Sequence, residues 1–205
     1  VRANGLPMVV PHNLLVLPHV RELVARVRAG EIGDLRLIEI QCSGWDIINA
    51  GIHWLNFALL LTHGDPVETV MAAIDHSTRT YRDGMQVETA AVTYATTRSG
   101  LRIVMNTGDY VTIGEAGKST LFRLVGTRGM IDFYAWESCY RIQNATFPHG
   151  QLINVPTGAK SGHQMHLEHL AGQMDSATPD YLVAETSLAA LELCDAAYVA
   201  GAHRC

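Results

Sequence analysis

The sequence predicts an α+β fold in which a large, mostly antiparallel sheet carries helices packed on one face. Three observations predict it. A mixed strand and helix segment opens the chain, six β-rich segments separated by turn residues follow, and two helical segments close it. Successive strands joined by short turns pair in antiparallel fashion. Several of these strands carry apolar residues on both faces, so we expect a second copy of the protein to cover the open sheet face as a homo-oligomer.

The first third of the chain is predicted to alternate strands and helices. Leu6–Val10 is a short apolar run and is expected to form a strand. His19–Ala29 has apolar positions at helical spacing and lies between Pro18 and Gly30, which predicts a helix. Leu35–Ser43 alternates between two sets of side chains, as a strand does, and leads almost directly into the next helix.

The second part of the chain is predicted to build most of the sheet. Its strands are expected at Val67–Asp75, Gln86–Thr97, Leu101–Thr107, Thr120–Gly126, Met130–Ala135 and Cys139–Ala145. Phe147–Gly162 contains several Pro and Gly residues and is predicted to be a loop. The two closing helices are expected at about His163–Ser176 and Tyr181–Ala200.

The helix near position 50 has an unusual composition. Ile52–Leu61 is almost entirely apolar, which predicts a buried helix. Asn49, His53 and Asn56 stand at i, i+4 and i+7 and would share one stripe of it, while Asp46 is a natural N-cap. Because unpaired polar groups are costly to bury, this stripe is expected to face something polar, such as a substrate. The alternative is that these side chains are satisfied structural residues.

Composition excludes several partners and compartments. The formal net charge of −5 and the lack of a basic run argue against nucleic acid, and no segment is long enough to span a membrane. The cysteines are scattered and form no C-x-x-C motif, which favours reduced thiols in a cytoplasmic protein. They are Cys42, Cys139, Cys194 and Cys205. No signal peptide is visible, and without an initiator Met the chain is expected to be a piece of a longer polypeptide.

Several short motifs occur in a characteristic order. Pro11-His12-Asn13 follows the first predicted strand, and a helix then ends in Ala29–Gly33. Asn49–His53 and Val125–Ile131 come next, and the closing helices contain Gly172 and Pro179. In this order they resemble the C-terminal substrate domain of the Gfo/Idh/MocA oxidoreductases. That family's corresponding motifs are G-x-I-G, D-x-G-x-H and G-T-x-G.

The resemblance implies the substrate-binding half of a nicotinamide-dependent oxidoreductase acting on a sugar, polyol or related hydroxy compound. Family members add an N-terminal Rossmann domain that holds NAD or NADP with a G-x-G-x-x-G loop. This sequence lacks that loop and the family's Glu-Lys-Pro triplet with its catalytic lysine. We therefore expect residues 1–12 to be the last strand of a Rossmann-type domain and residues 13–205 to be the substrate and dimerisation domain. The cofactor is expected in the full-length protein and not on this chain alone.

The resemblance also implies two catalytic positions. His53 takes the place of the family histidine that serves as acid and base at the substrate hydroxyl, or helps the catalytic lysine to do so, a task for which imidazole is suited near neutral pH. Asn49 stands where the family has Asp. An amide can orient a hydroxyl but cannot accept its proton, so this replacement favours an altered or lost redox role.

Further residues are expected around the pocket. Trp45 suits stacking on a sugar, with core packing as its alternative, and Asp46 suits hydroxyl recognition, with helix capping as its alternative. Asn56 is a third expected substrate contact. His12 and Asn13 are expected to face the cofactor cleft, and a plain turn is the alternative for both.

Two rival functions remain open. A non-catalytic ligand-binding or dimerisation module would fit the missing cofactor half and Asn49. A metal hydrolase would need the cluster His163, His166 and His169, but spacing of three rotates successive side chains apart on a helix. We expect no metal there and expect His166 to turn towards the substrate pocket instead.

Overall fold

Strand β1 (Leu35–Ser43) lies at the centre of an eight-stranded sheet. In this computed structural model, which describes residues 1–203, β1 pairs in parallel with β6 (Arg102–Gly108) and antiparallel with β7 (Thr120–Gly126). All other pairings in the sheet are antiparallel, and its order is β10-β9-β8-β7-β1-β6-β5-β2. The remaining strands are β2 (Val67–Asp75), β5 (Ala90–Thr97), β8 (Gly129–Tyr134), β9 (Cys139–Asn144) and β10 (Gln151–Asn154).

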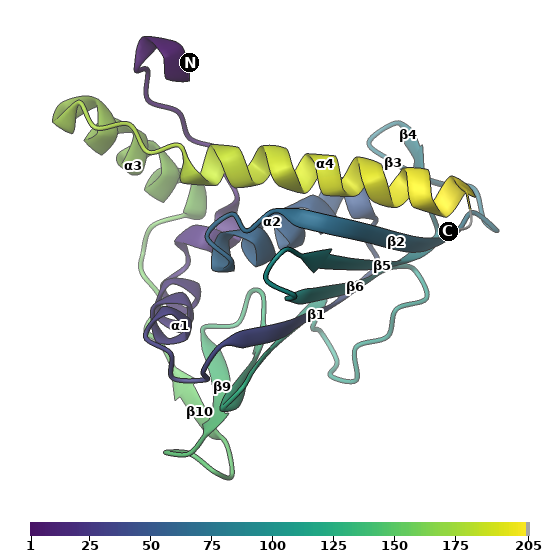
Figure 1. Cartoon of the computed structure of the whole chain (residues 1–205), viewed down its shortest axis with the longest axis horizontal. Helices are drawn as coiled ribbons and strands as arrows, with labels where there is room; N and C mark the ends of the chain where they lie inside the picture. Colours follow the sequence, from purple (N-terminus) through teal and green to yellow (C-terminus); the bar gives the residue numbers. More distant parts are fainter. Residues whose placement is uncertain (204–205) are drawn as a thin grey trace.

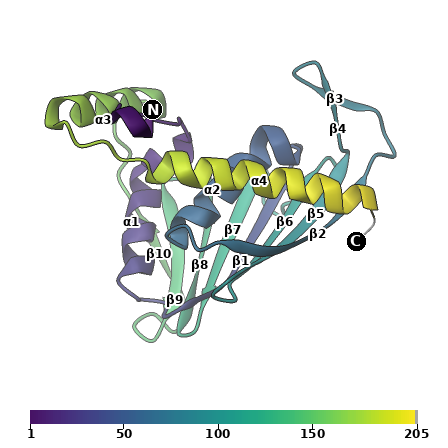
Figure 2. The same cartoon turned by 45° about the horizontal axis from the view of Figure 1, so that its top comes forward.

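The helices cover one face of this sheet, which confirms the predicted α+β architecture (Figure 1). Helix α4 runs across the sheet and packs on both α2 and β2 (Figure 2). Helix α3 stands apart from the sheet in both views and packs mainly on η2. The helices are α1 (Pro18–Arg28), α2 (Ile52–Leu61), α3 (Gly162–Ser176) and α4 (Leu182–His203), and the shorter turns are η1 (Arg2–Asn4), η2 (Asn13–Val16) and the π-helical η3 (Ile47–Gly51).

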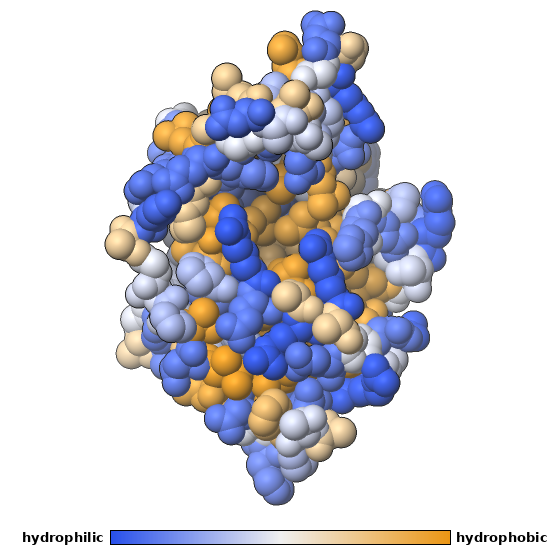
Figure 3. All heavy atoms as spheres, turned by 90° about the vertical axis from the view of Figure 1, so that its left-hand side faces the viewer, coloured by the Kyte–Doolittle hydropathy of each residue, from blue (hydrophilic) through white to orange (hydrophobic). Residues whose placement is uncertain are grey.

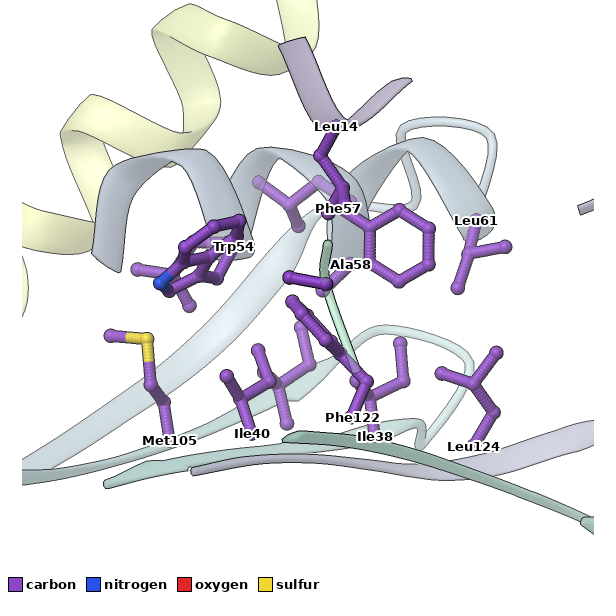
Figure 4. Close-up of a cluster of buried hydrophobic side chains, with 14 of the residues drawn as sticks. Leu14, Ile38, Ile40, Trp54, Phe57, Ala58, Leu61, Met105, Phe122 and Leu124 are labelled. Carbon is purple, nitrogen blue, oxygen red and sulfur yellow. The ribbon is translucent and has the colours of Figure 1, made fainter. Parts of the chain in front are cut away.

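The core lies between α2 and the sheet. Alternation along β1 turns Ile38 and Ile40 towards α2, where both are fully buried. Phe122 packs edge to face on Phe57 of α2, with ring centroids 5.2 Å apart, and stacks on Phe133 at 4.7 Å (Figure 4). Such ring pairs add to the stabilisation that burial alone gives. The prediction that α2 is a buried helix is therefore confirmed.

Two of the sequence motifs meet where β1 begins. Gly33 has φ +76°, a left-handed conformation that favours glycine, and a Cβ there would lie 2.2 Å from Thr127 Oγ1. A Cβ on Gly126 would lie 2.2 Å from the carbonyl oxygen of Ile32. The main chain of Thr127 donates to Asp34 at 2.9 Å. Both glycines are thus required by one close approach between the chain before β1 and the β7–β8 turn.

Three sequence predictions of local structure were wrong. Leu6–Val10 forms no strand, because no neighbouring strand among residues 1–203 pairs with it. The predicted strand Gln86–Thr97 is divided, since β4 (Met85–Val87) pairs with β3 (Thr80–Arg82) in a separate hairpin before β5 begins. The predicted loop after Phe147 contains β10, a strand of four residues that extends the sheet edge after the turn at Gly150.

The other face of the sheet carries exposed apolar side chains. Met71 and Val92 are 56% and 46% exposed, and each alternates with residues that face the helices. Their partly exposed neighbours on this face include Leu37, Tyr94 and Val104. A second hydrophobic surface occurs on the side at the left of Figure 1, where Figure 3 shows a hollow of hydrophobic side chains bordered by hydrophilic ones. The helices therefore leave apolar surface uncovered on at least two sides.

Membrane and disulfide features were also predicted from composition. Among the helices in residues 1–203, none is both long enough and apolar enough to cross a membrane. Cys42, Cys139 and Cys194 are free thiols, and Cys205 lies outside the described residues.

Candidate functional site

The site begins with a capped, widened turn at the start of α2. Asp46 is fully buried, and its Oδ1 accepts from the main-chain nitrogen of Asn49 at 2.8 Å. The nitrogen of Gly51 donates to the carbonyl of Asp46 at 3.0 Å, an i to i+5 bond that makes η3 a π-helical turn. Asn49 Nδ2 lies 3.1 Å from both carboxylate oxygens. Of the two roles considered for Asp46, helix capping is the one its contacts show, because its carboxylate does not line the cavity described next.

A cavity of about 260 Å³ lies beside this turn. All three tryptophans of the chain line it. Trp54 is buried and meets Trp136 edge to face at 5.7 Å, whereas Trp45 and Trp136 are about half exposed. The complete lining is Pro11, Asn13, Leu14, Trp45, Asn49, Ala50, His53, Trp54, Ser119, Thr120 and Trp136. The structure thus brings four of the predicted site residues together on one cavity.

A second histidine, His12, forms a hydrogen bond with the ring of His53. Nδ1 of His53 lies 2.7 Å from Nδ1 of His12, and the two rings meet edge to face. His12 Nε2 in turn lies 2.8 Å from Oγ of Ser187 on α4. Burial lowers the pKa of His53 below its ordinary value. For His12, burial and then the nearby His53 and His166 lower the pKa to about 4.

His12 does not line the cavity. It is 3% exposed, and both ring nitrogens are occupied by protein groups. Its neighbour Asn13 does reach the cavity, where its Nδ2 lies 3.4 Å from Nε2 of His163. Cofactor contact by His12 and Asn13 stays a prediction, and the observed position of His12 is behind His53.

The predicted polar stripe is divided between two surroundings. Asn49 and His53 face the cavity, but Asn56 is fully buried and donates to Thr186 at 3.0 Å and to Ser187 at 3.2 Å. Asn56 thus faces α4, because α4 packs on the side of α2 that this residue occupies. The expectation that all three polar residues face one ligand site is corrected accordingly.

The histidines of α3 do not join this cavity. His166 is 6% exposed, its Nε2 has no partner among the described residues, and burial lowers its pKa. It does not line the cavity, contrary to the expected turn towards the pocket. Within residues 1–203 no group of three or more His, Cys, Asp or Glu side chains could hold a metal ion.

Sequence reasoning missed several residues of the site. Trp136 follows β8 in a turn, and an aromatic residue at such a polar position is a signal that could have marked it. Ser119 precedes β7 and carries no such signal. Ser187 is one small residue in a long helix, so only the packing of α4 on α2 reveals its contact with His12.

Sequence comparison finds a family match for part of the chain. Residues 43–132, which run from the end of β1 into β8 and include the His53 motif, match the model of the GFO/IDH/MocA C-terminal domain. Over these residues the chain is similar to the Gfo/Idh/MocA C-terminal domain. No curated protein matches the sequence.

Several solved structures share the fold of this chain. An oxidoreductase from Agrobacterium radiobacter in complex with NAD+, L-tartaric acid and magnesium matches with a TM-score of 0.75 and 18% identity, over 100% of this chain and 65% of that one. A 3-ketoreductase from Actinomadura kijaniata in complex with TDP-benzene and NADP matches with a TM-score of 0.73 and 18% identity, over 97% of this chain and 63% of that one. Aldose-aldose oxidoreductase from Caulobacter crescentus, complexed with glycerol, matches with a TM-score of 0.80 and 18% identity, over 100% of this chain and 64% of that one. The chain spans less than two thirds of the length of each.

The buried histidine pair predicts a pH-dependent stability. Between about pH 6.5 and 4, His12 binds a proton in the unfolded state but not in the folded state. The free energy of unfolding should therefore fall as the pH is lowered through that window. Urea denaturation at several pH values should show this fall, and His12→Asn should reduce it. His76→Asn, which removes an exposed histidine, is the matched control and should leave the slope unchanged. Equal slopes for wild type and His12→Asn would contradict the assignment.

Proposed function

We propose that this chain is the substrate-binding half of a nicotinamide-dependent oxidoreductase that acts on a sugar, polyol or related hydroxy compound. The observation that carries the proposal is the position of His53, which lines an aromatic cavity and is bonded at Nδ1 by His12. Within residues 1–203, the ring nitrogen of His53 that is hydrogen-bonded is Nδ1, which leaves Nε2 for a ligand. A neutral imidazole placed in this way can accept the proton of a bound hydroxyl group.

The lining of the cavity supports a small hydroxylated substrate. Trp45 and Trp136 offer exposed aromatic surface against which the apolar face of a sugar can stack. Because Asn49 uses its Nδ2 on Asp46, its Oδ1 is the atom left to accept from a substrate hydroxyl. Two of the structural relatives are complexes with hydroxy compounds, L-tartaric acid and glycerol, which is the class that we propose here.

Proton transfer is the part of the reaction that we assign to this chain. When a hydroxyl-bearing carbon is oxidised to a carbonyl, the hydroxyl proton must leave, and His53 Nε2 would take it. In the reverse direction the same nitrogen would return it. The sequence has no G-x-G-x-x-G loop to cradle a pyrophosphate, so it does not fit a dinucleotide by itself. We therefore propose NAD or NADP for the full-length protein only, with residues 1–12 as the junction between its domains.

Substrate binding by this chain can be tested with simple hydroxy compounds. Glycerol, L-tartrate and aldoses titrated onto the 205-residue chain are expected to change its tryptophan fluorescence, because every tryptophan lines the cavity. Trp136→Ala should weaken binding by about 2- to 10-fold, as expected when one aromatic contact is lost. Tyr81→Ala removes a comparably exposed aromatic residue from β3 and should leave binding unchanged. If no hydroxy compound binds, or if both variants bind equally, the proposed substrate class is wrong.

The role of His53 can be tested by turnover. In the full-length protein, His53→Ala is expected to lower kcat for NAD(P)-linked oxidation of the hydroxy compound by about 10²- to 10⁴-fold, the usual contribution of a general base. His149→Ala, in the exposed turn before β10, is the control and should keep wild-type kcat. Unchanged turnover in His53→Ala would refute the assignment.

A non-catalytic ligand-binding or dimerisation module of the same fold is the second candidate. The observation that favours it is the amide at position 49, which is held by Asp46 and supplies no negative charge to stabilise a protonated His53. Under this alternative, hydroxy compounds bind to the cavity but no variant has any turnover to lose.

The open sheet face and the composition support proposals about partners and location. We propose that two copies pair through the face that exposes Met71 and Val92, since apolar patches of this kind mark interfaces. Nucleic acid is not proposed as a partner, because the net charge is −5. Free thiols at Cys42, Cys139 and Cys194 support a cytoplasmic location, where cysteines stay reduced.

The pairing of two copies predicts a specific response to charge. Val92→Lys should convert the dimer to a monomer in light scattering after gel filtration, because it places a charge in an apolar interface. Leu188→Lys, at a position on α4 that is 60% exposed, is the control and should remain dimeric. A wild-type chain that is monomeric at micromolar concentration would contradict the proposal.

A further inference from the structure

We propose that His12 is a positioning residue that holds His53 in the Nδ1–H tautomer and so leaves Nε2 of His53 as the proton acceptor of the cavity. The importance of this role rests on the proposed function, in which His53 is the base. The tautomer itself is a property of the chain alone. Its measurement needs neither substrate nor cofactor.

The hydroxyl of Ser187 has one proton to donate. Its Oγ lies 2.6 Å from the carbonyl oxygen of Val183, which can only accept, so the hydroxyl proton is directed there. Asn56 Nδ2 donates to the same oxygen at 3.2 Å. The Asn56 amide is fixed in this orientation because Thr186, its other partner, also directs its proton to a main-chain carbonyl. Ser187 can therefore only accept from its remaining neighbour.

That remaining neighbour is His12. With Ser187 as acceptor at 2.8 Å, the proton of His12 must be on Nε2. Nδ1 of His12 then carries a lone pair, and it faces Nδ1 of His53 at 2.7 Å. Two unprotonated nitrogens at that distance would repel each other, so His53 must donate its Nδ1–H. The lone pair of His53 is consequently on Nε2, because within residues 1–203 its hydrogen bond to His12 is made by Nδ1.

No other side chain near His53 takes over this task. Asn49, one turn earlier, has its amide nitrogen committed to Asp46, and Asp46 is itself held by Arg82 with 3.1 Å between Oδ2 and Nε. Burial, followed by the nearby His53 and His166, lowers the pKa of His12 to about 4. His12 is therefore neutral near neutral pH. His12 can therefore accept from Nδ1–H whether His53 is neutral or has gained a proton at Nε2. The proton can arrive and leave without reorienting either ring.

Nitrogen-15 NMR of the 205-residue chain at neutral pH tests the proposal, because the two ring nitrogens of a neutral histidine have different shifts when protonated and unprotonated. We expect His53 to be protonated at Nδ1 and His12 at Nε2. His19 is an internal reference, since its Nε2 lies 3.2 Å from the carbonyl of Ala135, which requires the Nε2–H form. Signals are assigned from single histidine variants.

Three variants separate positioning from general packing. His12→Leu removes the acceptor and should abolish the Nδ1–H preference of His53, whereas His12→Asn can place its Oδ1 near the position of the lost Nδ1 and should rescue it. Ser187→Ala leaves both rings in place but frees His12 to change tautomer, so it should weaken the preference. Ser176→Ala is the matched control, because Ser176 also donates to a carbonyl of its own helix and contacts neither ring.

The outcomes distinguish this inference from the proposed function. A wild-type His53 protonated at Nε2 would overturn it, as would a His12→Leu chain that keeps the Nδ1–H form together with native His19 signals. If His12→Leu does not fold, Ser187→Ala decides the question, and an unchanged His53 tautomer in that variant counts against the proposal. Failure of hydroxy compounds to bind would refute the proposed function and leave the tautomer result standing.

Discussion

The cavity depends on a carboxylate that the fold buries completely. Asp46 ends the extended chain after β1, caps the start of α2 and holds the amide of Asn49. A buried charge needs a counter-charge, and Arg82 supplies it from the β3–β4 hairpin at 3.1 Å. Arg82 also lies over the Trp45 ring at 5.6 Å and donates to Asp109 at 2.7 Å. One ion pair therefore fixes the start of α2, the hairpin and a wall of the cavity together.

A second buried carboxylate completes the start of that helix. Glu88 accepts from the main-chain nitrogen of Ile47 at 2.7 Å and from the hydroxyl of Tyr198 on α4 at 2.7 Å. Burial, followed by the bond to Glu88, raises the pKa of Tyr198. Free amides in the first turn of a helix require acceptors, and here each of two acidic side chains satisfies one. Helix α4 thus supports the site at two places, through Tyr198 near its end and Ser187 near its start.

The residue one helical turn before His53 is an amide, Asn49, and not an acid. With Asn at position 49, no carboxylate bonds to His53, and a neutral histidine from the turn before η2 takes the place next to its Nδ1. A neutral acceptor stabilises a protonated imidazole less than a carboxylate does. Burial lowers the pKa of His53 in the same direction. A predominantly neutral His53, able to accept a proton, follows from these surroundings.

The sequence by itself determined the fold class, the positions of most strands and helices, the burial of α2 and the place of His53, Asn49 and Trp45 around one cavity. The fold class, the elements and the burial of α2 follow from local patterns, namely apolar periodicity and turn residues, which act within a few positions along the chain. The expectation that His53, Asn49 and Trp45 line a pocket also rested on the resemblance to a known family. The tertiary structure alone decided that Asp46 and Asn56 are satisfied inside the protein and that His12 lies behind His53. It also joined Trp136 to the cavity and Ser187 to His12. The physical reason is that a polar side chain bonds to whatever neighbour packing brings within about 3 Å, and those neighbours come from distant parts of the chain.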